Sequence, residues 1–99
     1  MPLSVLNGNC LQVSGDLSLD SVARLYQESR TLLPGEIDAV DLNGVTRIDS
    51  AGLALLLEWQ AVARKGGTVL SFIGAPADLL RLAALCESTS LLGLTSRDG

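Results

Sequence analysis

The sequence has no histidine, and only one tryptophan, one tyrosine and one phenylalanine among its 99 residues. Without histidine, the chain lacks the commonest general base, the commonest metal ligand and any Ser-His-Asp triad. The GxxxxGK[ST] motif of a phosphate-binding P-loop is also missing. These absences remove most enzyme classes, so we expect no catalytic residue, no metal site and no cofactor.

Basic residues are scarce. Seven Lys and Arg stand against eleven Asp and Glu, which gives a net charge of −4, and Lys65 is the only lysine. Nucleic acid binding depends on clustered basic side chains that neutralise phosphates. Electrostatic attachment to anionic lipid needs similar clusters. The sequence therefore argues against both nucleic acid and a membrane surface as direct partners.

Long hydrophobic runs are absent too. The longest reach five residues, as in Leu53–Leu57, whereas a membrane span needs about 20. The N-terminus shows no basic segment followed by a long apolar stretch, so we expect no secretory signal. Cys10 and Cys86 are far apart and form no CxxC motif, which predicts two buried thiols in a reducing compartment. These features predict a cytoplasmic protein without a membrane span.

The chain is rich in aliphatic residues. Hydrophobic residues make up 47% and charged residues 18%, a composition that excludes disorder and fits one small globular domain. The mean hydropathy of +0.38 is high. Because large exposed apolar patches mark interaction sites, we expect a partner to cover part of the surface.

Strand-like and helix-like patterns alternate along the chain. Strands are predicted at 3–6, 10–13, 37–42 and 68–73, and helices at about 21–33, 50–65 and 77–86. Turns are expected at 15–18, at Asn43-Gly44 and around 88–94, an extended connection at 45–49 and a loose tail at 95–99. Asn7-Gly8 predicts a hairpin, and strands joined across helices should be parallel. The predicted fold is α/β: a mixed four-stranded sheet with an antiparallel edge hairpin and a parallel remainder, packed with three or four helices.

The helices differ in their apolar patterns. The first has one stripe, predicted to face the core: Val22, Leu25, Tyr26, Ser29, Leu32 and Leu33. The second has a core stripe of Leu55, Leu56, Trp59, Val62 and Ala63. It also has a further apolar side of Leu53, Ala54, Leu57 and Ala61. A helix on one face of a sheet needs a single stripe, so the second side is predicted to face a partner.

The junction that leads into the second helix is the most informative segment. Ser50 is expected at or beside the N-cap, where its oxygen would accept a free N–H. Asp49 would lie against the positive end of the helix dipole, and Gly52 would permit another backbone to approach closely. By spacing alone, these residues describe either an ordinary capped helix with a packing glycine or a docking surface.

The stretch Ile37–Leu53 (IDAVDLNGVTRIDSAGL) resembles the core signature of STAS domains, the sulfate-transporter and anti-sigma-factor-antagonist modules. Val13–Leu17 (VSGDL) is similar to the family's earlier G-[ED]-L element. The resemblance covers nearly the whole chain and implies a single STAS domain over residues 1–99.

Within this family, two runs resemble small stand-alone STAS subunits of bacterial phospholipid ABC transporters: Gly52–Leu57 (GLALLL) and Ala61–Gly66 (AVARKG). Such subunits act in the maintenance of outer-membrane lipid asymmetry. The resemblance implies a non-catalytic protein that binds the transporter's ATPase subunit, within a complex containing a permease and MCE-type subunits. It would lie at the cytoplasmic face of the inner membrane, held there through its partner.

The resemblance also implies which residues touch that partner. Asp49, Ser50, Ala51, Gly52 and Leu53 would form the contact loop, and Ala54 and Leu57 would extend it along the helix.

Two alternatives stay open. Ser50 matches the position that is phosphorylated in anti-sigma factor antagonists. A phosphate there would add about −1.5 to −2 charges and would repel a partner. In the other alternative, Asp41, Asp49 and Ser50 would form a catalytic or ligand-binding site.

Overall fold

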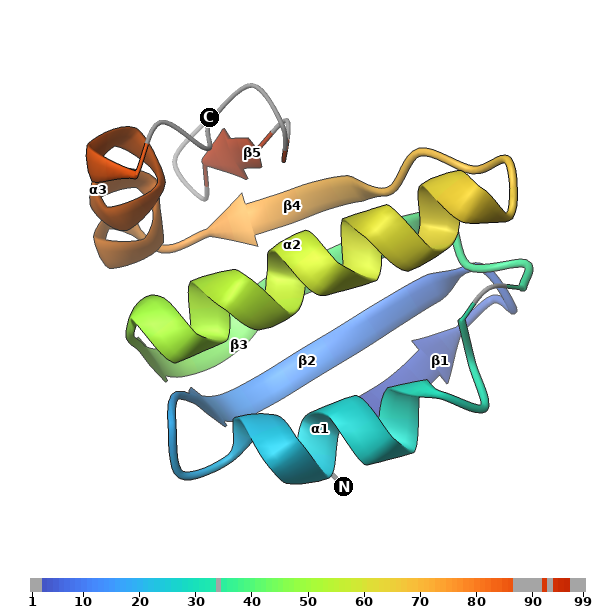
Figure 1. The fold of residues 1–99 in the computed structure, drawn as a ribbon, viewed down its shortest axis with the longest axis horizontal. Helices are drawn as coiled ribbons and strands as arrows, with labels where there is room; N and C mark the ends of the chain where they lie inside the picture. The colour runs from blue at the N-terminus through green and yellow to red at the C-terminus, as the bar shows by residue number, and fades with distance from the viewer. Residues whose placement is uncertain (1–2, 34, 87–91, 93, 97–99) are drawn as a thin grey trace.

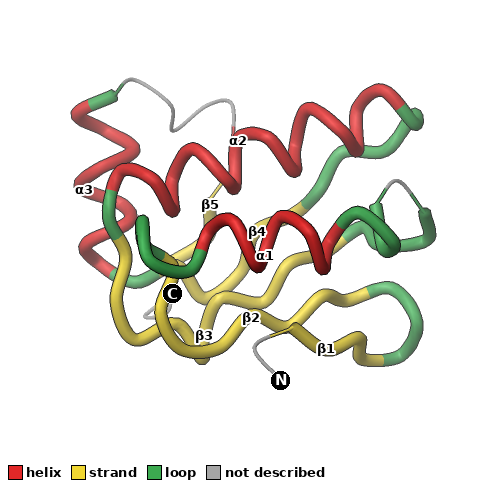
Figure 2. The backbone as a smooth tube through the Cα atoms, turned by 60° about the horizontal axis from the view of Figure 1, so that its bottom comes forward, coloured by secondary structure: helices red, strands yellow, loops and turns green. Residues whose placement is uncertain are grey.

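A computed structural model describes residues 3–33, 35–86, 92 and 94–96 of the chain. It shows one five-stranded sheet with helices packed on one of its faces (Figures 1 and 2). In chain order the elements are β1 (Leu3–Leu6), β2 (Cys10–Leu17), α1 (Val22–Ser29), β3 (Ala39–Ile48), α2 (Ser50–Lys65), β4 (Ser71–Ala75), α3 (Ala77–Leu85) and β5 (Leu94–Ser96).

The strands lie in the sheet in the same order as in the chain. β1 and β2 are antiparallel and are joined by Asn7 and Gly8, whose φ angles of 58° and 80° suit a type I′ turn. The β2–β3, β3–β4 and β4–β5 pairs are parallel. The predicted mixed sheet is therefore confirmed. Each parallel connection leads to the next strand on the same side of the previous one. Because such connections share one handedness, their helices α1, α2 and α3 lie on the same face of the sheet.

The structure adds a fifth strand to the four that the sequence predicted. β5 forms where the sequence predicted the end of a turn and the start of a loose tail. The rest of those two predictions, at 88–91, 93 and 97–99, lies outside the described residues.

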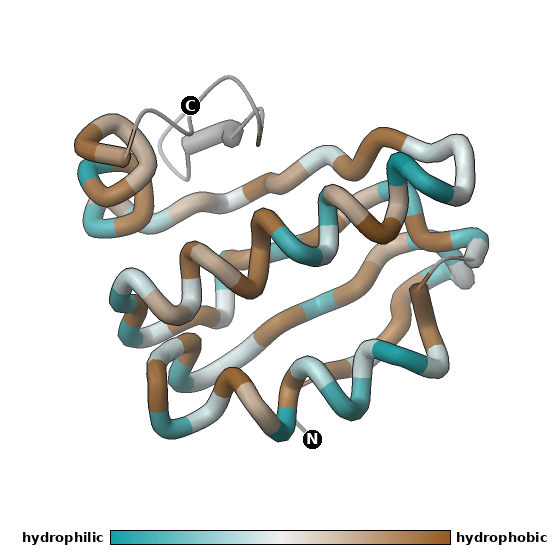
Figure 3. The backbone as a smooth tube through the Cα atoms, viewed as in Figure 1, coloured by the Kyte–Doolittle hydropathy of each residue, from teal (hydrophilic) through white to brown (hydrophobic). Residues whose placement is uncertain are grey.

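The core lies between the sheet and the helices. Strand residues with at most 1% exposure meet helix residues that are equally buried: Leu11, Val13, Val40, Leu42 and Phe72 from the sheet, and Leu25, Leu56 and Trp59 from α1 and α2. Apolar and polar positions follow one another along β2 (Figure 3), and buried positions alternate with less buried ones in the first half of both β2 and β3. The opposite face of the sheet carries partly or fully exposed residues such as Ser4, Gln12, Asp41 and Ser71. This alternation is typical of a sheet covered on one side.

The predicted turn at Asn43-Gly44 is wrong, because β3 runs through both residues. Gln12 pairs with Asp41 but Ser14 pairs with Gly44, so β3 carries one extra residue there. Such an insertion is a β-bulge. The Asp41 carboxylate accepts hydrogen bonds from the Asn43 backbone N–H at 2.9 Å and from its side-chain amide at 2.8 Å. The hydrogen bonds from Asn43 to Asp41 are typical of a turn. Because β3 pairs with β2 both before and after these residues, they form a bulge within the strand.

A similar correction applies to the predicted turn at 15–18. β2 continues to Leu17, with Gly15 at a φ of 85° beside a second register shift. α1 is shorter than predicted and ends at Ser29. Tyr26, predicted to face the core, is 39% exposed.

Candidate functional site

The first turn of α2 is capped by Asp49 and not by Ser50. Asp49 has an extended backbone, and its Oδ1 accepts hydrogen bonds from the N–H groups of Ala51 at 2.9 Å and Gly52 at 3.1 Å. Of the two positions expected for Ser50, at or beside the N-cap, the structure has the second, and Asp49 rather than Ser50 accepts the free N–H groups. Ser50 becomes the first helical residue and is exposed.

Asp49 also ties the helix to the loop that follows β2. Its Oδ2 accepts a hydrogen bond from the Leu19 N–H at 3.1 Å, and its own N–H donates to the Leu17 carbonyl oxygen at 3.4 Å. The pKa of Asp49 is held below its usual value, first by the Leu19 hydrogen bond, then by those of Gly52 and Ala51, and by the nearby charge of Arg47. The carboxylate is therefore kept ionised and in place, where it complements the helix dipole.

At Gly52 the backbone of α2 lies close to the backbone at the end of β2. A Cβ atom built there would lie 2.0 Å from the Leu17 carbonyl oxygen and 3.0 Å from Cγ1 of Ile48. Only glycine fits at this distance, so the close backbone approach predicted from the sequence is confirmed. Gly52 and Asp49 together fix the start of α2 against the end of β2.

The predicted partner-binding residues divide into two groups. Gly52 and Leu53 are buried, and Leu53 is only 3% exposed. The prediction that Leu53 belongs to an outward apolar side is therefore wrong, because its side chain packs in the core. Ser50 and Ala54 are exposed, whereas Asp49, Ala51 and Leu57 are half-buried. We call the accessible group (Ser50, Ala51, Ala54 and Leu57) the outer face of α2.

A groove runs along each side of the outer face. The first, of about 410 Å³, lies between the start of α2 and α3 and is lined by Ile48, Asp49, Ser50, Asp78, Arg81, Leu82 and Leu85. The second, of about 380 Å³, lies between α1 and α2 and is lined by Val22, Ala23, Tyr26, Ala51, Ala54, Leu55 and Glu58. Leu85 is 81% exposed. The contribution of α1 and α3 was missed, because the sequence pattern of one helix does not show which neighbours flank it.

The alternative site built from Asp41, Asp49 and Ser50 does not form. Asp41 lies in β3 beside Gln12 and Asn43, whereas Asp49 lies beyond the other end of the same strand. Because the stretch from Asp41 to Ile48 lies alongside only Gln12 to Leu17 of β2, at about 3.3 Å per residue the two carboxylates are separated by roughly 20 Å. Within the described ranges, no group of three His, Cys, Asp or Glu residues is arranged to hold a metal ion. No helix in the described part of the chain has the length and apolar character needed to cross a membrane.

Comparison with known proteins agrees with this architecture. A family model described as the MlaB-type STAS domain matches residues 5–93. The intermembrane phospholipid transport system binding protein MlaB of Escherichia coli K12 is 35% identical over 78 residues, which cover 79% of each chain. The MlaB protein of Shigella flexneri matches to the same extent.

Two solved structures share the fold at low sequence identity. A Thermotoga maritima protein assigned as an anti-sigma factor antagonist has a TM-score of 0.77 at 13% identity, covering 94% of this chain and 83% of its own. The anti-sigma factor antagonist SpoIIAA, in its unphosphorylated form, has a TM-score of 0.64 at 12% identity, covering 84% and 80%. At such identities these likenesses define the fold alone.

The helix-covered mixed sheet and the capped, glycine-dependent start of α2 place the chain among STAS domains. The family match and the relatives place it further: the chain belongs to the MlaB-type STAS domain family.

Proposed function

We propose that this protein is a non-catalytic accessory subunit that binds the ATPase subunit of a phospholipid ABC transporter. The observation that carries the proposal is the 35% identity, over 79% of both chains, to a binding protein of an intermembrane phospholipid transport system. In this proposal the partner is an MlaF-like ATPase, assembled with a permease and MCE-type subunits. The protein would lie at the cytoplasmic face of the inner membrane through that partner, in the maintenance of outer-membrane lipid asymmetry.

The outer face of α2 has the properties of a docking surface. Ala51 and Ala54 are small, so a partner backbone could come close to the helix, and the neighbouring grooves could receive larger side chains. Asp49 and Gly52 hold this face rigidly from beneath. A preformed surface loses little conformational entropy on binding, which favours affinity.

The test is direct binding of the purified ATPase subunit to matched variants. Ser50→Arg places a long cation at the N-terminal end of the outer face and should weaken binding at least tenfold. Ser71→Arg makes the same change on the exposed face of β4, away from the helices, and should bind as wild type does. Thermal unfolding verifies that both variants are folded. Equal binding by Ser50→Arg and Ser71→Arg would remove the outer face from the proposal.

A second candidate is a switch controlled by phosphorylation of Ser50. Ser50 is exposed at the first turn of α2, and its hydroxyl makes no hydrogen bond to any described residue. A phosphate of about −1.5 to −2 charges would be tolerated there by the helix dipole but would stand beside the Asp49 carboxylate and repel an apolar partner. Mass spectrometry of the protein from its native cells would test this. Phosphate on Ser50, with loss of binding to an anti-sigma factor, would favour the switch.

A further inference from the structure

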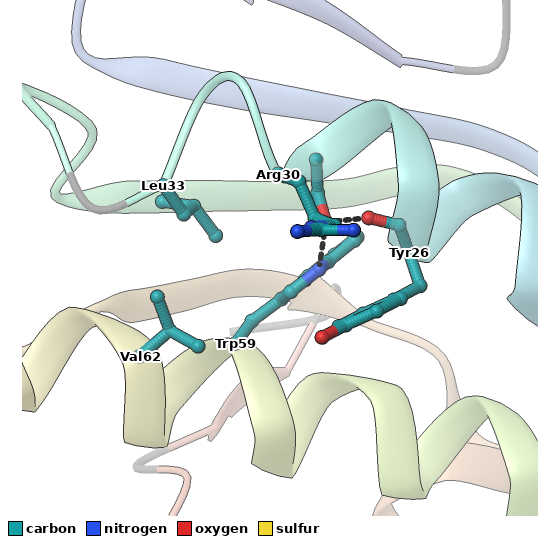
Figure 4. A pocket seen from close by; sticks show the side chains of 6 residues that line it. Tyr26, Arg30, Leu33, Trp59 and Val62 are labelled. Atoms are coloured by element: carbon teal, nitrogen blue, oxygen red, sulfur yellow. Dashed lines mark hydrogen bonds between the residues drawn. The ribbon is translucent and has the colours of Figure 1, made fainter.

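A small pocket lies between the C-terminal half of α1 and the middle of α2. It has a volume of about 180 Å³ and is lined by Tyr26, Ser29, Arg30, Leu33, Trp59 and Val62. In Figure 4 the Trp59 indole points from α2 toward α1, flanked by Leu33 and Val62 on one side and by Tyr26 on the other. We call it the Trp59 pocket.

The polar atoms on the floor of this pocket already have partners. The Trp59 Nε1–H donates to the Ser29 hydroxyl at 2.8 Å, and that hydroxyl donates to the Tyr26 carbonyl oxygen at 2.8 Å. Trp59 is 1% and Ser29 2% exposed. The floor is therefore a fixed, apolar surface. The indole N–H already donates to Ser29, so it cannot donate to a group that enters the pocket.

The rim carries two polar groups that the fold does not use. Across the described ranges, no carboxylate pairs with the exposed Arg30 guanidinium, and no group hydrogen-bonds to the Tyr26 hydroxyl. Arg24, one turn and a half earlier on α1, differs because it faces Glu28 at 4.0 Å. A guanidinium presents forked donors that match a carboxylate in geometry and charge.

The size of the pocket restricts what could occupy it. A cavity of about 150 Å³ suffices for benzene, whereas sites for drug-sized ligands span roughly 300–1,000 Å³. The Trp59 pocket therefore suits one aliphatic or aromatic side chain. Its chemistry, an apolar floor with a cation at the rim, calls for an apolar group that stands next to a carboxylate.

The pocket continues the groove that borders the outer face of α2. Tyr26 lines both the Trp59 pocket and the α1–α2 groove, and α1 and α2 lie side by side (Figures 1 and 2). Glu58 lines that groove and would repel a carboxylate, whereas Arg30 lines the Trp59 pocket and would attract one. The charges thus fix where along the groove an acidic group could be placed.

We propose that the Trp59 pocket receives an apolar side chain of the partner protein and that Arg30 binds a carboxylate next to that side chain. This proposal rests on the proposed function for the identity of the partner, the ATPase subunit. In this proposal the partner makes an apolar contact at the outer face of α2 and a second, charged contact at Arg30. The partner group at the second contact is a carboxylate next to an apolar side chain.

The pocket itself can be tested without the partner, because Trp59 is the only tryptophan. Its fluorescence should change saturably with 3-phenylpropionate at millimolar concentrations, and more weakly with the uncharged 3-phenylpropanol. Arg30→Gln should weaken binding of the acid about fivefold, leaving the alcohol unaffected. Arg24→Gln removes an equal charge from within α1, the helix that Arg30 follows, and should change neither. Equal binding of acid and alcohol, or no saturable change, would overturn the proposal.

A parallel measurement with the purified ATPase subunit separates this proposal from the function. Arg30→Gln should weaken that complex about fivefold and reduce its dependence on salt, whereas Arg24→Gln should not. If Ser50→Arg abolishes binding but Arg30→Gln behaves like Arg24→Gln, the outer face stands and the Trp59 pocket is rejected as part of the interface. If the wild-type protein does not bind the subunit, the proposed function fails. The fluorescence titration then still shows whether the Trp59 pocket binds an apolar group next to a carboxylate.

Discussion

The two sides of the first turns of α2 have opposite roles although they alternate in one short sequence. On the inner side, Asp49, Gly52 and Leu53 all support the fold, through a cap with three hydrogen bonds, a close backbone approach and a buried side chain in the core. On the outer side, Ser50 and Ala54 are exposed and do not pack in the core. The segment from Asp49 to Ala54 therefore contains both the residues that stabilise the start of α2 and the residues that are exposed on its outer face.

Gly52→Ala should produce the largest loss of stability on the inner side. The new Cβ would lie 2.0 Å from the Leu17 carbonyl oxygen, so either α2 or β2 has to move. Overpacking typically costs about 1–3 kcal/mol and more when backbone must shift, and we expect about 3 kcal/mol or more here. Urea unfolding followed by circular dichroism measures it. A variant with wild-type stability would show that α2 is not seated as closely as described.

Asp49→Ala should be the next most damaging change. It removes the acceptor for the N–H groups of Ala51, Gly52 and Leu19. We expect a loss of about 1–3 kcal/mol, since a lost cap costs about 0.5–2 kcal/mol and the Leu19 contact adds to it. Asp49→Asn keeps an acceptor oxygen and should lose less. If the alanine and asparagine variants unfold at the same urea concentration, the hydrogen bonds of Asp49 are not what stabilises this junction.

The charge of Asp49 also predicts how stability depends on pH. Its pKa is lower in the folded protein than the value of about 3.9 expected in the unfolded chain. The unfolded state therefore binds a proton first on acidification, so the contribution is fully present above pH ~4 and is lost as pH falls through the lowered pKa. Below pH 4, the unfolding free energy of wild type should fall more steeply than that of Asp49→Asn. Parallel curves would show that other carboxylates account for the acid sensitivity.

The sequence predicted the order of the first seven elements and the hairpin well, because hydrophobic periodicity and the Asn7-Gly8 turn are local signals. It failed where pairing overrides local preference. Asn43-Gly44 reads as a turn, yet pairing with β2 before and after the bulge, at Asp41 and at Gly44, holds those residues in a strand. Propensity cannot anticipate such tertiary effects.

Burial of polar groups was a second failure. Gln60 is a polar residue among the apolar residues of α2, yet it is only 4% exposed. Its side-chain amide donates to the Leu70 carbonyl oxygen at 3.0 Å and accepts from the Leu70 N–H at 2.8 Å. These two bonds satisfy the backbone before β4 and allow the amide to lie in the core. A single sequence does not show that such a partner will be within reach.

At the site, the sequence identified the right segment but divided its roles wrongly at Ser50 and Leu53. On a helical projection Leu53 lies about 100° from Ala54 but only about 60° from Leu56 of the core stripe, and packing against the sheet covers Leu53 together with that stripe and leaves Ala54 exposed. Likewise, Asp49 and Ser50 are both good caps, and only the extended backbone at Asp49 decides between them. Local chemistry proposes the candidates, and backbone geometry selects one.

Ser50→Ala gives the smallest expected effect and so the finest test of the comparison. Had Ser50 been the cap, alanine would cost about 0.5–2 kcal/mol. Because Asp49 caps the helix and alanine has the best helix propensity, stability should change by less than about 0.5 kcal/mol. The unfolding midpoint in urea measures it, with Asp49→Ala beside it as the capping control. A loss as large as that of Asp49→Ala would mean that the outer side of the turn also supports the fold, and the division between support and surface would disappear.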